Sequence, residues 1–495
     1  MKKRSLAMLL TALTMLSACT SDTTASENEL IDDLDDEIYE EIFDNTSVTG
    51  PKEDSENRAG EISGVTEAEG PAAEISEPDE EVHADLMEFL PKSKLKNRTV
   101  KFLSYYDPWN GSDTPYENAA AELFSEKYDG EIEWYSTTYD RRFSDFEIHI
   151  IGAGQALDFV AGMDYFPRSC IDGSVISYDD YVDWESPIWS SVKDLNDPYM
   201  IGGKHYMIAC YAEEECVVFY NKNVIRENGF EDPWELYKNG EWTMSKFTSM
   251  LEDYVDEKNE RYGLRGLFNA APLTLVSGKI PVSLENGRLM NNLSDPDFNR
   301  ALNYQYELYQ KGLMTDFINE NVSGTSQENY VSDGKALFCI SHAEAFSSMG
   351  NSDDIGAVPI PKDDLADKYY HSADIECYSL CANTDNPKGA IRLMECLIAS
   401  YNDESTRAKV NEWYKNEYGW TDEFVERRDD ISRLAGKNPV ADIYYGFPKD
   451  ASSMVTKMVY TPLQTADFNA IKNYDGNEFD FIIEEINAQL EALSE

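Results

Sequence analysis

The sequence contains few histidines and few basic residues. Its 495 residues include five histidines, and 42 Lys and Arg stand against 94 Asp and Glu, for a formal net charge of −52. Proteins that bind a nucleic-acid backbone need a cationic face, so nucleic acid is a poor candidate partner. Five scattered histidines also leave little imidazole for metal sites or general-base catalysis. We therefore expect no nucleic-acid partner, no metal ion and no cofactor.

Motifs for several common chemistries are also missing. The chain has no Cys-x-x-Cys, no phosphate-binding P-loop and no Gly-x-Ser-x-Gly nucleophile motif. His342-Ala343-Glu344 is similar to the His-x-Glu of zinc deaminases, but Cys377 and Cys381 do not form the Pro-Cys-x-x-Cys that completes that motif. We therefore predict a protein that is not an enzyme.

Long hydrophobic runs are missing after the first residues. Lys2, Lys3 and Arg4 precede an apolar run from Leu6 to Leu16, which is too short to cross a bilayer and is typical of a secretory signal in residues 1–18. Leu16-Ser17-Ala18-Cys19 resembles a bacterial lipobox, which implies cleavage before Cys19 and diacylation, with palmitate for example, of its sulfur. The mature protein is then expected at the extracytoplasmic face of the cell membrane, held by lipid.

Cysteine is also scarce. Eight are present, and lipidation of Cys19 leaves seven, an odd number. Cys210 and Cys216, and Cys377 and Cys381, are the closest pairs. Disulfides and buried thiols are both open for these residues, because four of the seven lie within apolar, strand-like runs.

An acidic segment follows the lipobox. Residues 21–90 hold 24 Asp and Glu and two basic residues, interrupted by Pro51, Pro71 and Pro78. Such a composition buries too little apolar surface to offset chain entropy, and its like charges repel one another. We expect residues 19–96 to be a disordered tether between the membrane and a folded body.

The folded body alternates short apolar strands with amphipathic helices. Residues 98–106, 158–162, 216–220, 336–340, 355–359 and 377–382 have the length and composition of strands. Thr243 and Asn386-Pro387 are helix-start signals, and the residues after each have the apolar spacing of one helix face. This alternation predicts an α/β architecture.

Three stretches resemble the bacterial extracellular solute-binding proteins of ABC importers, in the large family that includes maltodextrin and oligosaccharide binders. The first is Gly203-Lys204-His205-Tyr206 with Val218-Phe219-Tyr220-Asn221-Lys222 and Trp242-Thr243; the second is Gly334-Lys335-Ala336-Leu337-Phe338 with Ile355–Pro361; the third is Ala382-Asn383 with Asn386-Pro387-Lys388. The resemblance covers roughly Arg98 to the C-terminus.

The resemblance implies a two-lobe, type II periplasmic-binding-protein-like fold. Each lobe has a central mixed sheet flanked by helices, and hinge crossovers join the lobes near residues 208–213 and 371–376. Lobe one is expected to comprise residues 97–209 and 376–430, and lobe two residues 210–375 and 431–495. Closure about the hinge would trap a ligand between the lobes.

The expected ligand is a sugar or oligosaccharide, because aromatic faces and carboxylate or amide side chains recognise apolar CH faces and rings of hydroxyls. Candidate ligand-binding residues are aromatic, acidic, amide or imidazole side chains that follow strands or lie at the crossovers. They are Asp107, Trp109, Asn110, Asp164, Tyr165, Tyr211, Glu213, Asn269, His342, Asp374 and Tyr445. The other expected partners are the two permease subunits of an importer, and the protein is expected to be a monomer.

Several alternatives remain open. The negative charge favours a cationic ligand such as a polyamine, and a peptide ligand is also possible. A surface glycan-processing enzyme would need two carboxylates about 5 to 9.5 Å apart across a cleft. A ligand-sensing or adhesive lipoprotein would keep the two lobes without coupling them to import.

Overall fold

The computed structural model describes residues 86–110, 115–152, 156–265, 268–315, 327–349, 353–461 and 476–493. These residues all belong to the compact unit Glu77–Glu495, to which the following description applies. The predicted signal peptide, Cys19 and tether residues 19–85 lie outside the described residues. No helix among the described residues is long and apolar enough to cross a membrane.

The first sheet is built mainly from the N-terminal strands. β1 (Thr99–Ser104) pairs in parallel with β2 (Glu131–Ser136) and with β3 (Phe159–Ala161). The strand order is β13-β12-β3-β1-β2, and β4 (Ile208–Glu214) also pairs with β12 (His371–Leu380). The short strand β13 is Pro439–Val440. This sheet is therefore mixed, as expected.

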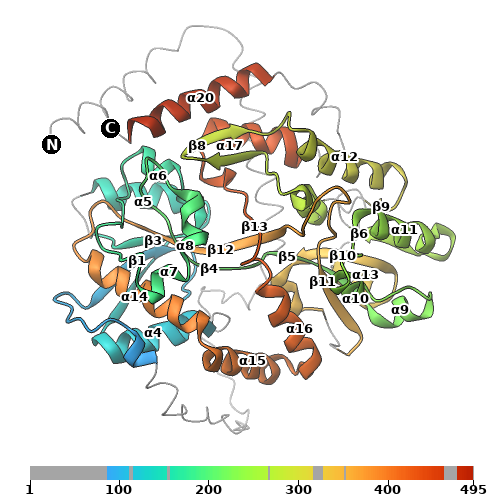
Figure 1. Ribbon diagram of the computed structural model, residues 1–495, viewed down its shortest axis with the longest axis horizontal. Helices are drawn as coiled ribbons and strands as arrows, with labels where there is room; N and C mark the ends of the chain where they lie inside the picture. The colour runs from blue at the N-terminus through green and yellow to red at the C-terminus, as the bar shows by residue number, and fades with distance from the viewer. Residues whose placement is uncertain are drawn as a thin grey trace, which may run out of the picture. The chain divides into compact units, whose positions relative to one another are not determined.

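Helices cover both faces of the first sheet (Figure 1). On one face α4 (Pro115–Tyr128) packs against α14 (Pro387–Asn402), with Phe102, Phe124 and Leu393 in the shared core. The core on the other face joins α5 (Arg142–Ile151), α17 (Lys449–Val455) and α20 (Gly476–Ala492) with the hairpin of β7 (Val282–Glu285) and β8 (Arg288–Asn291).

The second sheet has the order β11-β5-β10-β6-β9. Its strands are β5 (Cys216–Asn221), β6 (Tyr262–Arg265), β9 (Met314–Thr315), β10 (Ala336–His342) and β11 (Ile355–Pro359). Trp242, Phe247 and Phe338 lie in its core, where the rings of Phe247 and Phe338 stack with centroids 4.9 Å apart. Surrounding helices are α9 (Lys222–Glu227), α10 (Pro233–Lys238), α11 (Met244–Tyr254), α12 (Pro296–Gln310), α13 (Gln327–Ser332), α15 (Glu404–Tyr418) and α16 (Asp422–Ser432).

Short helical segments complete the described structure. They are η1 (Met163–Tyr165), α6 (Arg168–Ile171), α7 (Pro187–Ser190), α8 (Lys193–Asn196), η2 (Asp197–Tyr199), η3 (Glu257–Asn259), η4 (Phe268–Ser277), η5 (Ala343–Ser347), η6 (Tyr444–Gly446) and η7 (Thr456–Tyr460).

The predicted helix starts are confirmed by their capping contacts. The Thr243 hydroxyl accepts a hydrogen bond from the backbone N–H of Lys246 at 3.3 Å, at the start of α11. The Asn386 side-chain oxygen accepts one from the N–H of Gly389 at 3.1 Å, and Pro387 occupies the first position of α14. Each cap satisfies a backbone donor that has no partner within its helix.

The chain passes between the two sheets where β4 continues into β5 through Glu215. There β12 lies beside β4 and runs antiparallel to it (Figure 1). In this pairing Asp374 lies opposite Glu213. The backbone of Ser372 accepts a hydrogen bond from the N–H of Glu215 at 2.9 Å, and its hydroxyl accepts one from Cys216 N–H at 2.9 Å. This pairing holds the two crossing segments together.

A buried histidine–carboxylate contact lies at the same crossing. The His371 ring nitrogen Nδ1 is 2.8 Å from the carboxylate of Glu214, and both side chains are 2% exposed or less. The Glu214 carboxylate also accepts a hydrogen bond from the Ser372 hydroxyl at 3.4 Å. Burial raises the pKa of Glu214, and its bonds to His371 and Ser372 oppose that rise.

The described part of the predicted tether is folded, contrary to expectation. Leu90 is 1% exposed and belongs to the core beneath α4 and α14. The Tyr128 hydroxyl donates to the Pro91 carbonyl at 2.9 Å, and Arg392 donates to the Ser93 hydroxyl at 3.1 Å. Residues 86–96 are therefore part of the folded body, because a few apolar side chains in a polar segment suffice to dock it.

Two C-terminal segments pack differently from the lobe boundaries expected from the sequence. Phe424, with the rest of α16, joins the core of the second sheet. Tyr444, Phe479 and Ile483 join a core of the first sheet. The chain thus returns to the first sheet after α16, which local sequence patterns did not show.

None of the seven cysteines among the described residues forms a disulfide, and all seven are buried, which resolves the alternative left open by the sequence. Cys210, Cys339, Cys381 and Cys396 are each fully buried. They pack as small apolar side chains.

One buried amide holds the start of β4. The Asn196 side chain accepts from Ala209 N–H at 2.9 Å and donates to the Ala209 carbonyl at 2.8 Å. It also accepts from the Tyr178 hydroxyl at 2.7 Å and donates to the Val192 carbonyl at 2.9 Å. The crossing strand is thereby tied to α8.

We predict that Asn196→Ala destabilises the protein, because it leaves several buried backbone groups without partners. A loss of about 2–4 kcal/mol corresponds to a fall in Tm of about 2–5 °C. Differential scanning calorimetry measures it. Asn402→Ala, at an exposed amide on α14, is the control and is expected to change Tm by less than about 1 °C. Equal effects of the two substitutions would contradict the role of Asn196.

Candidate functional site

Carboxylates from four chain segments converge beside the crossing. The pKa of Asp374 is raised to about 6, first by burial and then by the charges of Glu213, Glu344 and Asp164, in that order. Asp374 nevertheless keeps an exposed surface. An accessible carboxyl surrounded by protein atoms and other acids is well placed to meet a polar solute. Among the predicted site residues, the fold therefore brings Asp164, Glu213 and Asp374 together.

A second pair of acids lies next to Tyr211. The Tyr211 hydroxyl donates to the carboxylate of Glu117, a buried residue of α4. Burial raises the pKa of Glu117 to about 7. Glu376 lies opposite Tyr211 in the β4–β12 ladder, and its pKa is raised well above its usual value by burial and then by Glu117. The Tyr211 ring stacks on Tyr401 with centroids 4.1 Å apart, so Tyr211 is half-buried here.

Two exposed tyrosines adjoin these carboxylates. Tyr105 and Tyr106, directly after β1, are 46% and 40% exposed, and their ring centroids are 5.1 Å apart. The pKa of Tyr106 is raised chiefly by the charge of Glu376 and then by burial. Burial, followed by the charge of Asp164, raises the pKa of Tyr105 to about 12. Large aromatic surfaces therefore face water next to acids of the crossing.

A third acidic group joins the crossing from the C-terminal segment. Burial raises the pKa of Glu215 to about 8, with contributions from the charges of Asp374 and Asp442. Burial also raises the pKa of Asp442 to about 6, although its carboxylate accepts hydrogen bonds from the Tyr460 hydroxyl and from Tyr444 N–H. Tyr445, a predicted site residue, is half-buried next to Tyr444, with ring centroids 4.0 Å apart.

Arginines balance only part of this negative charge. Arg142 Nε is 2.8 Å from the Asp164 carboxylate, and the guanidinium lies 3.6 Å above the Tyr139 ring centroid. Arg428 of α16 is 3.4 Å from Glu213. Because α16 packs with the second sheet and Glu213 lies on β4, this ion pair joins elements of the two sheets.

The prediction for Trp109 as a ligand platform is wrong in this structure. Its ring is 2% exposed and lies edge-on to Phe102 and Phe159, with centroids 6.4 and 6.3 Å away. The turn after β1 directs this side chain into the core. The neighbouring Asp107 side chain accepts from Trp109 N–H at 3.1 Å and from the Asn110 amide at 2.9 Å, so it stabilises the turn locally.

Of the other predicted residues that the structure describes, His342 lies at the crossing beside Glu215, whereas Tyr165 does not. Tyr165 is buried against Phe143 and Phe146, with ring centroids 5.4 and 5.1 Å away. His342 is exposed at the end of β10. The side chain of Asn269 lies outside the described residues.

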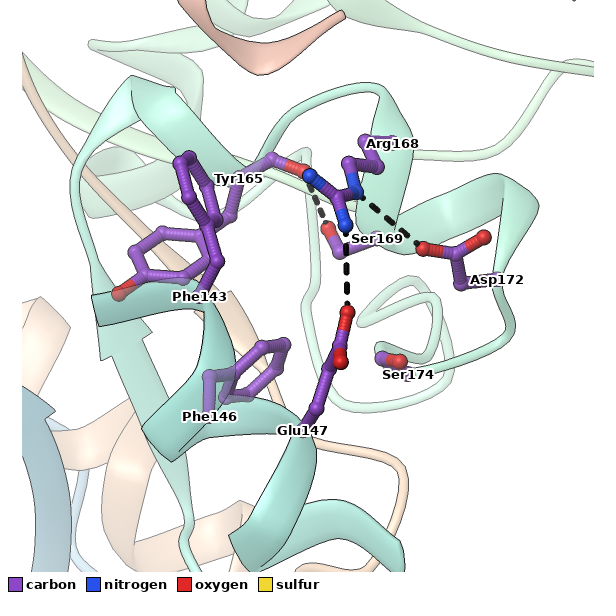
Figure 2. Close-up of a pocket in the computed structure, with 8 residues that line it drawn as sticks. All are labelled: Phe143, Phe146, Glu147, Tyr165, Arg168, Ser169, Asp172 and Ser174. Carbon is purple, nitrogen blue, oxygen red and sulfur yellow. Dashed lines mark hydrogen bonds and ion pairs between the residues drawn. The ribbon is translucent and has the colours of Figure 1, made fainter. Parts of the chain in front are cut away.

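A small pocket opens beside Tyr165 (Figure 2). Its lining comes from α5 and the α6 region, all on the first-sheet side. Arg168 pairs there with Glu147 at 3.2 Å and with Asp172 at 3.6 Å, so ion pairs already occupy its polar groups. Its cavity volume of about 10 Å³ is far below the usual range for a ligand cavity, about 300–1,000 Å³. We do not place the solute in this pocket.

Several residues of the crossing were missed by the sequence analysis. They are Tyr105, Tyr106, Glu117, Glu215, Glu376, Tyr401, Arg428 and Asp442. The signal for Tyr105 and Tyr106 was present, since two aromatic residues end the predicted strand of residues 98–106. Nothing local distinguishes Glu117 or Asp442 from the many surface acids of this chain.

The fold is that of a solute-binding protein, the type II periplasmic-binding-protein-like fold. Residues 119–415 match the family described as bacterial extracellular solute-binding protein, and the chain belongs to that family. An extracytoplasmic location fits this family. Its members and the structural relatives below are binding proteins rather than enzymes.

Solved structures share the fold at low sequence identity. The GacH receptor of Streptomyces glaucescens, studied unliganded and with acarbose, is 14% identical, with a TM-score of 0.53, covering 80% of this chain and 99% of GacH. A substrate-binding protein from Listeria monocytogenes in complex with cycloalternan is 14% identical, with a TM-score of 0.54 and coverages of 80% and 99%. The sugar-binding protein MalE of Xanthomonas citri is 14% identical, with a TM-score of 0.54 and coverages of 80% and 97%. No curated protein matches the chain.

We predict that Asp374→Asn raises the Tm at neutral pH. The folded state raises the pKa of Asp374, so it retains a proton that the unfolded chain loses, and the stability of the wild type falls as the pH rises from about 4 through about 6. Asparagine removes this penalty. Allowing for solvent screening of an exposed side chain, we expect a gain of about 1–3 °C at pH 7.5 and a smaller gain at pH 5.

Thermal unfolding at both pH values measures this difference, with Asp367→Asn, on an exposed loop, as the control. A Tm for Asp374→Asn that is lower than the wild type at pH 7.5 would show that the carboxylate stabilises the fold.

Proposed function

We propose that the protein captures a carbohydrate between its two lobes and delivers it to an ABC permease pair. The observation that carries this proposal is the pair of exposed rings, Tyr105 and Tyr106, beside the β12 carboxylates of Asp374 and Glu376. Aromatic faces stack on the apolar CH faces of sugars, and carboxylates accept hydrogen bonds from hydroxyl groups. The three structural relatives described above bear names or ligands of sugar-binding proteins, which supports this choice.

Hinge closure is the proposed means of capture. The crossing at β4, Glu215 and β12 is where the two sheets connect, so a small change of backbone angles there would move one sheet relative to the other. A solute that contacts both sides favours the closed state only by the difference between its affinities for the closed and open states. Asp374, Glu376 and Tyr106 supply contacts from the first sheet, and Glu344 supplies one from the second.

The density of acids favours a second candidate, a cationic polar solute such as a polyamine or an amino sugar. Carboxylates raise one another's pKa at this place, and a bound cation would relieve that repulsion. A neutral sugar would instead donate its hydroxyl protons to the same oxygens. Thermal-shift measurements with mono- and oligosaccharides, amino sugars, polyamines and peptides separate these candidates.

We predict that Tyr106→Ala weakens sugar binding about tenfold or more while leaving Tm without ligand within about 2 °C, because an exposed stacking ring is lost. Isothermal titration with the sugar that gives the largest thermal shift measures the affinity. The control is Phe481→Ala, at a ring on α20 that is 62% exposed, which is expected to bind normally. Unchanged affinity of Tyr106→Ala would place the solute elsewhere.

The protein is proposed to bind its solute without transforming it. Acid pairs alone do not identify a glycosidase in a chain with 94 Asp and Glu. Incubation of the purified protein with the bound oligosaccharide, followed by product analysis, tests this directly. Release of shorter sugars would favour the glycan-processing alternative. Co-purification with a permease pair is a separate test, and its failure would favour sensing or adhesion.

Attachment to the membrane is proposed to occur through lipid on Cys19, with the acidic leader as tether. We predict that Cys19→Ser shifts the protein from the membrane fraction to the soluble fraction, because lipid chains supply the membrane affinity. Fractionation and immunoblotting of expressing cells measure this. The control is Ser21→Ala, two residues beyond the lipobox. A variant that stays in the membrane fraction would contradict lipid anchoring at Cys19.

A further inference from the structure

Three side chains with different donor atoms meet where β4 passes into β5. A carboxylate oxygen of Glu215, the sulfur of Cys216 and a ring nitrogen of His342 all lie within 4.8 Å of one another. Cys216 and His342 are directly opposite in the β5–β10 ladder, and Cys216 Sγ is 3.9 Å from His342 Nδ1. The sheet thus brings together two residues that are far apart in the sequence.

This spacing suits a tetrahedral metal ion. Zinc binds cysteine sulfur at about 2.3 Å and histidine nitrogen at about 2.0–2.1 Å, which places the two donors about 3.6 Å apart at a tetrahedral angle. The observed separation of 3.9 Å between Cys216 and His342 is close to this value. Small side-chain rotations would therefore suffice to bring both donors onto one ion.

The backbone around these donors is held by hydrogen bonds. Ala343 N–H donates to the Glu215 carbonyl at 2.8 Å, which joins the end of β10 to the crossing. Ser372 accepts from the N–H groups of both Glu215 and Cys216 at 2.9 Å. Donors on strands fixed in this way retain their relative positions better than donors on loops.

The surroundings favour a cation that enters from solvent. His342 is exposed and Glu215 is partly exposed, whereas Cys216 is buried, so the cluster is open on one side. The charges of Asp374 and Asp442 act on Glu215 through space. A divalent ion would therefore enter a negative field.

We propose that Glu215, Cys216 and His342 form a three-ligand site for a divalent transition-metal ion, with Zn²⁺ the ion that best suits the donors. Thiolate, imidazole and carboxylate together favour zinc over Mg²⁺ or Ca²⁺, which prefer oxygen ligands. On binding, the Cys216 thiol releases its proton to solvent and the thiolate coordinates the ion. Three protein ligands leave a fourth position for water. The site goes beyond the proposed solute binding and does not depend on it.

Titration of the metal-free, reduced protein with Co²⁺ tests the proposal. We expect one ion per chain, visible d–d bands of tetrahedral cobalt and a sulfur-to-cobalt charge-transfer band, all removed by one equivalent of Zn²⁺. His342→Ala, at an exposed position, is expected to weaken Co²⁺ binding about 100-fold and to alter the d–d bands. His149→Ala and Cys339→Ser are the matched controls and are expected to keep wild-type spectra.

Cys216→Ser is expected to lose the charge-transfer band, and its far-ultraviolet circular dichroism checks that it folds. If it does not fold, His342→Ala decides. Lack of the charge-transfer band in the wild type, or an unchanged affinity and spectrum in His342→Ala, would overturn the site. Because the readout needs no sugar, the metal site and the proposed solute binding can fail independently.

Discussion

The antiparallel pairing of β4 with β12 is the constraint on which the arrangement depends. Within this pairing, β4 leads the chain from the first sheet to the second, where the chain continues into β5 after Glu215. The buried pair of Glu214 and His371 lies within it, and loss of either partner would leave a polar or charged group buried without compensation, at a cost of several kcal/mol. Asp374 and Glu213 lie opposite one another only because this register is maintained.

The same pairing concentrates negative charge. Glu117, Glu215, Asp374 and Asp442 all have raised pKa values, so the folded chain holds them at a cost in stability near neutral pH. Such a cost is typical of a functional site, where side chains are placed for ligand chemistry rather than for stability. Arg142 and Arg428 reduce this cost only in part, through single ion pairs.

Local patterns were sufficient for much of the fold. The six strands predicted from apolar runs correspond to β1, β3, β5, β10, β11 and part of β12. The caps at Thr243 and Asn386 mark real helix starts, since capping depends on residues within one turn. The motif pattern around residues 203–243 and 334–361 indicated the family that the comparison confirms.

The site required information that no local window contains. Trp109 and Tyr106 both follow β1, yet the turn buries Trp109 and exposes Tyr106. The residue type alone does not indicate whether an aromatic side chain after a strand is buried or exposed. Leu90 and Phe479 join cores formed by residues hundreds of positions away. Periodicity and capping act within a few residues, so they define strands and helices. Glu117 meets Glu376, and Cys216 meets His342, only when the sheets assemble. Long-range pairing of strands decides which of many similar acids and thiols become neighbours.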